Sequence, residues 1–84
     1  MLYARAVPKL PPAVAAADVP TIDKLVWLYI YNNPGEHSDR SLWADLGVRP
    51  RGAIKRLVEA GALVEVSPPA GTKAGEYRVK KKGE

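Results

Sequence analysis

The sequence contains no cysteine and only one histidine, His37. The absence of cysteine excludes a disulfide framework and a cysteine-based zinc site. It also fits a reducing interior, so we expect a cytoplasmic or nucleoid-associated protein. His37 has only Glu36 and Asp39 near it in the sequence, which is too small a set for a metal site. We therefore expect neither a metal nor a cofactor.

Further absences argue against an enzyme and against a membrane protein. Ser38 and Ser41 have no evident base with an orienting partner, and the chain has no glycine-rich phosphate loop with an adjacent lysine. No apolar run reaches the roughly 18 residues that a membrane-spanning helix needs. Prolines at positions 8, 11 and 12 interrupt the N-terminal apolar stretch, which argues against a signal peptide.

Positive charge is concentrated in the C-terminal half of the chain. Residues 1–48 carry 4 basic and 5 acidic side chains (net −1), whereas residues 49–84 carry 9 basic and 4 acidic ones (net +5). Such an asymmetry indicates that one end of the molecule faces a polyanion. A solvated basic tail is the alternative, because Lys80, Lys81 and Lys82 supply three of these charges.

The length of 84 residues suits one domain. We expect an N-terminal extension at 1–20, a folded domain at 21–81 and a short basic end at 82–84. Within the extension, residues 2–7 are compatible with a short strand. The proline-rich segment 8–20 predicts an extended, poorly ordered connector.

The folded domain is predicted to begin with a helix. Thr21 is a suitable cap, and Asp23 lies in the first turn, where negative charge favours the helix dipole. The seven apolar residues 25–31 are also compatible with a buried strand, but the cap and the length before the turn at 33–35 favour a helix. Because it is apolar on nearly all sides, this helix should lie in the core.

Two more helices and a hairpin are expected after it. Ser38 can cap a helix that runs to Leu46, and Gly47 is suited to ending it in the left-handed conformation. Pro50 fits the first position of the next helix, which we place at 49–60. Beyond it, alternating patterns predict strands at 63–67 and 76–81, joined by a flexible loop at 68–75. In the first strand Val64 and Val66 share a face.

Helix 49–60 carries the strongest functional signal. At 100° per residue, one side holds small and apolar residues that can pack on the other helices: Ala53, Ile54, Leu57 and Ala60. The other side holds Arg51, Gly52, Lys55, Arg56 and Glu59. Arg and Lys near the N-terminal end of a helix can reach guanine acceptors or phosphates in a major groove. An ordinary solvated helix with a basic face is the alternative.

Segments 42–48 (Leu-Trp-Ala-Asp-Leu-Gly-Val) and 54–63 (Ile-Lys-Arg-Leu-Val-Glu-Ala-Gly-Ala-Leu) resemble the helix-turn-helix core of winged-helix DNA-binding proteins. Segment 24–29 is similar to the first helix of such domains in phage and plasmid replication or regulatory proteins. The resemblance covers about residues 21–81. It implies an α+β winged helix-turn-helix fold, in which three helices are followed by a β-hairpin wing.

The chain departs from the family pattern at two places. Trp43 stands where the family usually has alanine, so it either packs on Gly52 and Ala53 or points outward as a contact residue. Arg49-Pro50 stands where a serine or threonine cap is usual. The short spacing from Gly47 to Gly61 is closer to excisionase-like and MerR-like modules.

The resemblance implies binding to double-stranded DNA, with helix 49–60 in the major groove and the wing 68–75 on the backbone or in the minor groove. The role would be that of a small transcription regulator or of a replication or recombination accessory factor. The expected contacts are Arg49, Arg51, Gly52, Lys55, Arg56, Lys73, Lys80, Lys81 and Lys82. The alternative is a winged-helix module that binds protein, or an inhibitor subunit of a nucleic-acid machine. The partners considered besides DNA are a second copy of the chain, in a homodimer, and another protein.

Overall fold

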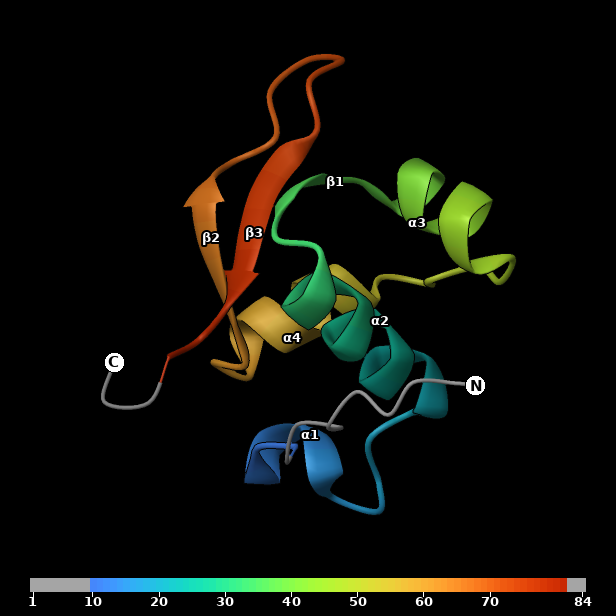
Figure 1. The fold of residues 1–84 in the computed structure, drawn as a ribbon, viewed down its shortest axis with the longest axis vertical. Coiled ribbons are helices and arrows are strands. Elements are labelled where there is room, and N and C mark those ends of the chain that lie inside the picture. Colours follow the sequence, from blue (N-terminus) through green and yellow to red (C-terminus); the bar gives the residue numbers. More distant parts are fainter. Residues whose placement is uncertain (1–9, 82–84) are drawn as a thin grey trace, which may run out of the picture.

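A computed structural model of the chain describes residues 10–81. Over that range the protein is an α+β structure with four helices and one three-stranded antiparallel sheet (Figure 1). Its elements are, in chain order, α1 (Pro12–Ala15), α2 (Thr21–Asn32), β1 (Gly35–His37), α3 (Asp39–Leu46), α4 (Ala53–Glu59), β2 (Leu63–Ser67) and β3 (Gly75–Val79).

The last strand lies in the middle of the sheet. β3 pairs with β1 on one side and with β2 on the other, both antiparallel. β2 has an irregularity at Val66, because Glu65 pairs with Tyr77 whereas Ser67 pairs with Glu76. The prediction that Val64 and Val66 share one face of β2 is therefore wrong, because the irregularity interrupts the alternation. The buried residue of β2 is Leu63, and Val66 is half exposed. β1 was not predicted, since three residues after a turn are too few to show a period.

Helix α2 packs on α4 and on the sheet to form the core. The apolar run 25–31 is helical, as predicted, and it contributes three buried side chains, Val26, Trp27 and Ile30. The Trp27 indole Nε1 donates a hydrogen bond of 3.2 Å to the Ala62 carbonyl, which fixes the start of β2 against α2. The remaining buried apolar residues are Val14, Leu42, Ala53, Ile54, Leu57, Ala62, Leu63 and Tyr77.

The boundaries of α3 are confirmed. Ser38 Oγ accepts a hydrogen bond from the Ser41 N–H (3.1 Å) while the Ser38 N–H donates to Ser41 Oγ (2.9 Å), which forms a reciprocal capping box. Gly47 follows with φ 75° and ends the helix in the left-handed conformation. The predicted cap at Thr21 is wrong, because Pro20 occupies the N-cap position of α2 and Thr21 is already helical.

The predicted connector at 8–20 is wrong for the described part of that segment. Residues Pro12–Ala15 form α1, and Val14 is completely buried against the core. Pro12 occupies the first turn of the helix, where backbone N–H groups make no intrahelical hydrogen bond, so the lack of an N–H in proline does not weaken the helix. Burial of Val14 supplies the tertiary stabilisation that four residues lack on their own. The predicted strand at 2–7 lies outside the described residues.

The predicted start of helix 49–60 is also wrong. Arg51 and Gly52 have φ values of 50° and 78°, which are left-handed, so α4 begins only at Ala53. Pro50 is buried and precedes the helix instead of opening it. The inner face is confirmed for Ala53, Ile54 and Leu57, whereas Ala60 is exposed after the last turn.

One ion pair connects the start of α2 to α4. The Arg56 guanidinium donates to both carboxylate oxygens of Asp23, at 2.9 Å (Nε to Oδ2) and 2.7 Å (Nη2 to Oδ1). Its Nη1 donates to the Arg51 carbonyl at 2.6 Å, so the same side chain also holds the turn before α4. The Asp23 side chain is only 4% exposed, whereas that of Arg56 is 43% exposed.

This unequal burial predicts unequal effects of removing each partner. Arg56→Met leaves a buried carboxylate without a partner and should lower the free energy of unfolding by about 3 kcal/mol. Asp23→Ala lets the Arg56 head turn to water and should lower it by about 1–2 kcal/mol. Urea denaturation of both variants measures the difference. The double variant should lose less than the sum of the two, and additive losses would contradict the coupling.

Candidate functional site

A hollow of about 820 Å³ lies between α3, α4 and the β2–β3 hairpin, and we call it the groove. Three consecutive residues at the start of α3 line it, Ser38, Asp39 and Arg40. The exposed side of α4 forms a second wall, with Gly52 before it and Lys55 and Glu59 on it. The loop between β2 and β3 closes the remaining side. The groove thus joins residues that are up to 40 positions apart in sequence, from His37 to Tyr77.

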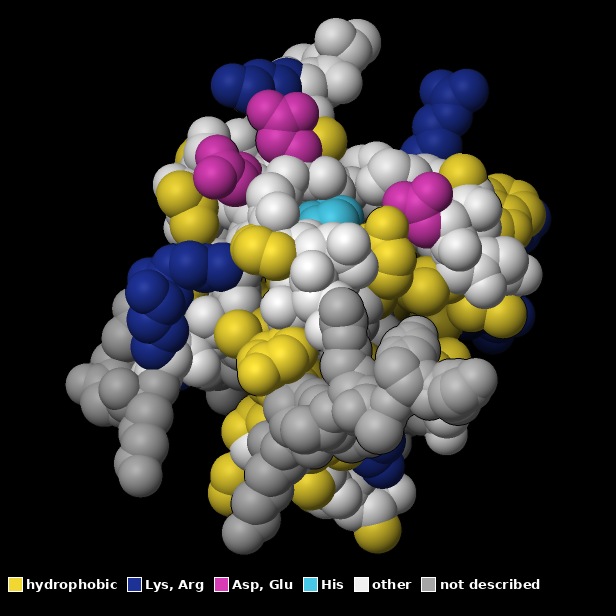
Figure 2. Space-filling view, in the orientation of Figure 1, with side chains coloured by type: hydrophobic (Ala, Val, Ile, Leu, Met, Phe, Trp, Pro, Cys, Tyr) yellow, Lys and Arg dark blue, Asp and Glu magenta, His cyan; other side chains and the backbone are white. Residues whose placement is uncertain are grey.

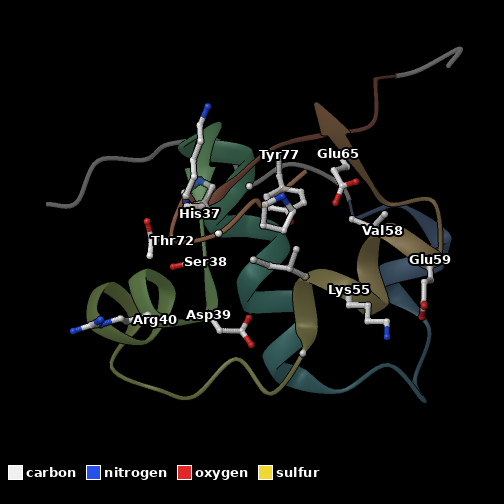
Figure 3. Close-up of a pocket in the computed structure, with 17 residues that line it drawn as sticks. His37, Ser38, Asp39, Arg40, Lys55, Val58, Glu59, Glu65, Thr72 and Tyr77 are labelled. Carbon is white, nitrogen blue, oxygen red and sulfur yellow. The ribbon is translucent and has the colours of Figure 1, made fainter. Parts of the chain in front are cut away.

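The rim of the groove carries charges of both signs. Its three cations come from three elements, namely Arg40 from α3, Lys55 from α4 and Lys73 from the hairpin loop. Figure 3 shows Arg40 and Lys55 on either side of the hollow. Three exposed carboxylates line it as well: Asp39, Glu59 and Glu65. The formal charge of the lining therefore sums to zero with His37 neutral.

The space-filling view shows how charged side chains are distributed on one face of the molecule. On the face shown in Figure 2, Lys and Arg side chains lie apart from one another near the edges, with Asp and Glu close to some of them. The predicted concentration of positive charge does not form one continuous patch on that face.

The floor of the groove is packed and partly polar. The Tyr77 ring is buried, and a Cβ atom on Gly75 would lie 2.5 Å from its hydroxyl, so only glycine allows this approach. The His37 imidazole is buried beside it; its Nε2 lies 2.6 Å from the Asn33 carbonyl, and its ring meets that of Tyr29 edge to face. The Nδ1 atom of His37 is buried and has no hydrogen-bond partner among the described residues.

The structure divides the nine predicted contact residues into separate places. Gly52, Lys55 and Lys73 line the groove together. Arg49 and Arg51 line a different hollow, beside the start of α2, and the two hollows share no lining residue.

Three further predicted contacts, Arg56, Lys80 and Lys81, line neither hollow. The head of Arg56 is bound to Asp23, and this hydrogen bond raises its pKa above the ordinary value for arginine. Lys80 and Lys81 follow the far end of β3, where the Lys80 N–H donates to the Ala62 carbonyl, away from the hairpin loop. Lys82 lies outside the described residues.

Sequence reasoning missed Arg40 as a member of the groove. The sequence does show that Arg40 comes two residues after the Ser38 cap, and side chains in the first turn of a helix are often exposed. What could not be read from the sequence is that the hairpin folds back beside that turn. β1 makes this possible, because it pairs with β3 and leads directly into Ser38.

In comparisons with protein-family models, curated proteins and solved structures, the chain has no significant match. Residues 10–81 contain no group of three or more His, Asp or Glu side chains placed to hold a metal ion. Over the same range, no helix combines the length and the apolar character needed to cross a membrane.

The buried phenol on the floor predicts a loss of stability in alkali. Burial, and secondly the Glu65 carboxylate, raise the pKa of Tyr77 above its ordinary value of about 10. A raised pKa means that folding favours the neutral phenol, so this contribution is complete below about pH 10 and disappears as the pH rises through the folded-state pKa. Thermal unfolding between pH 8 and 11 measures the effect.

Tyr77→Phe provides the control, because it keeps the buried ring and removes the ionisable group. The wild type should lose more stability than this variant as the pH rises above about 10. Parallel losses in the two proteins would show that Tyr77 is not a source of the alkaline instability.

Proposed function

We propose that the chain is a winged-helix domain that binds double-stranded DNA along the groove, as a small regulator or as an accessory factor in replication or recombination. In this arrangement α4 faces the major groove, and the hairpin loop lies on the backbone or in the minor groove. The observation that carries the proposal is that Lys55 of α4 and Lys73 of the loop line one groove, although 18 positions separate them in sequence.

The order of the elements supports the proposal. A helix, a short strand, two helices and a hairpin follow one another, and the short strand pairs with the last strand of the hairpin. This layout is compatible with the winged-helix fold that the resemblance of segments 42–48 and 54–63 implies. The left-handed Gly47 between α3 and α4 fits the glycine in the turn of that motif.

The charges define what kind of binding to expect. Arg40, Lys55 and Lys73 are exposed and stand on three elements around the groove, so each can reach a different phosphate. Neutralising three phosphates gives a slope of about −2.7 for log K against log salt concentration. The nearby carboxylates oppose the polyanion, so we infer a modest affinity.

Sequence selectivity should be low for a structural reason. The helix α4 has only seven residues, and its exposed face carries Lys55, Arg56 and Glu59. Because Asp23 holds the Arg56 head, Lys55 is the cation on α4 that is left to meet guanine acceptors. Most of the binding free energy would then come from phosphate contacts, which carry no direct sequence information.

Removal of the two lysines tests the proposal directly. We expect wild-type binding to a fluorescent 20-base-pair duplex to weaken about 40-fold between 50 and 200 mM salt. The Lys55→Ala, Lys73→Ala double variant should reduce the slope from about −2.7 to about −0.9. Fluorescence anisotropy at four salt concentrations gives both quantities.

Two further variants complete the experiment. The Lys80→Ala, Lys81→Ala double variant also removes two positive charges, but at a place outside the groove. It should change the salt slope much less. Glu59→Gln removes a carboxylate from the groove and should strengthen binding. Equal effects of the two double variants would contradict binding in the groove, and the absence of salt-dependent binding by the wild type would contradict the function.

A further inference from the structure

A second hollow, of about 440 Å³, lies between the start of α2 and the turn that connects α3 to α4. Its apolar lining consists of Ile22, Leu25 and Val48, and its polar lining consists of Arg49 and Arg51. Leu25 and Val48 are 44% and 43% exposed, although both are large apolar side chains. The proposed DNA-binding function makes no use of this hollow.

An exposed tryptophan extends the apolar surface beside it. Trp43 is 47% exposed and points outward from α3, and none of its atoms lies within 4 Å of the position that a Cβ on Gly52 would take. The Arg49 guanidinium lies 4.4 Å from the centre of the Trp43 ring, in a cation–π contact. Together we call Ile22, Leu25, Trp43, Val48, Arg49 and Arg51 the turn patch.

The turn patch combines cations that no described carboxylate neutralises with a fixed backbone at Arg51. Within residues 10–81, no carboxylate lies within salt-bridge distance of Arg49 or Arg51. The Arg51 backbone is fixed, since its carbonyl accepts a hydrogen bond from Arg56, which in turn is bound to Asp23. Arg51 is also the only described residue other than glycine with a positive φ, at 50°. Strained backbone of this kind concentrates at sites where function requires it.

We propose that the turn patch binds an acidic, apolar segment of a partner protein. An apolar side chain of the partner fills the hollow between Leu25 and Val48, and Asp or Glu residues beside it pair with Arg49 and Arg51. The charges favour this occupant, because the lining has two cations, no acid and an apolar floor. Tryptophan and arginine are also the residue types that contribute most to protein interfaces. The phosphates of DNA would pair only with the two arginines and would leave the apolar floor uncovered.

A selection from a display library of random 16-residue peptides tests this proposal. The full chain is the bait, and the Leu25→Asn variant is used to remove peptides that bind elsewhere. Because Leu25 is half exposed, this variant should fold, which circular dichroism and thermal unfolding check. We expect the enriched peptides to combine Asp or Glu with Leu, Ile, Phe or Trp. No enrichment, or enrichment of neutral or basic peptides, would overturn the proposal.

Synthetic versions of the enriched peptides then locate the site. The Arg49→Ala, Arg51→Ala double variant should weaken peptide binding at least 10-fold. Lys55→Ala, Lys73→Ala removes the same charge from the groove and should change it less than 2-fold. Similar losses from both variants would show that charge alone attracts the peptide, which would overturn the proposal.

Two other occupants of the patch are separate outcomes of the test. If Arg49→Ala, Arg51→Ala weakens DNA binding as strongly as the lysine variant does, the patch belongs to a DNA interface. If sedimentation shows a wild-type dimer that Leu25→Asn dissociates, a second copy covers the patch. Either result overturns the proposal. Loss of the DNA function alone does not, because peptide binding is measured without DNA.

Discussion

The carboxylate of Asp23 lies inside the protein, and the guanidinium of Arg56 makes its burial tolerable. A carboxylate removed from water without a partner destabilises the folded state by several kcal/mol, so the two side chains have to meet for α2 and α4 to pack as they do. The third hydrogen bond of Arg56, to the Arg51 carbonyl, extends this constraint to the turn before α4. One side chain therefore fixes the positions of two helices and the turn that separates the two hollows.

This constraint determines which cations remain for function. In the sequence, Arg51, Lys55 and Arg56 form one basic face, and a continuous recognition surface is the natural interpretation. In the structure the face is divided: Arg56 belongs to the fold, Arg51 turns toward the start of α2, and Lys55 faces the groove. The groove then acquires Arg40 and Lys73 from elsewhere in the chain. The proposed DNA surface thus depends more on tertiary structure than on the composition of one helix.

Local signals predicted the parts of the fold that local interactions determine. Ser38 and Gly47 predict the two ends of α3 correctly, because a cap and a left-handed glycine act within one turn of the helix. Residues 63–67 form β2 as expected. Helix α1 was not predicted, and the predicted start of α4 was wrong, because tertiary contacts decide both: Val14 is buried in the core, and Arg56 binds the Arg51 carbonyl in the turn before α4.

The candidate site was only partly predictable for the same reason. Lys55 and Lys73 were identified from charge and position, but the pairing of residues 23 and 56, which are 33 positions apart, leaves no mark in a single sequence. The sequence allows two orientations of the Trp43 side chain, and its exposure in the structure supports the outward one.

The central claim is that duplex DNA lies along the groove. Backbone amide NMR shifts, followed while an unlabelled duplex is added to the full chain, test it most directly. If the duplex lies along the groove, the largest shifts fall on residues 53–59 and 71–75 and at Arg40, with small ones at Leu25 and Val48. Shifts concentrated around the turn patch or at residues 79–81, with the α4 amides unchanged, would contradict it.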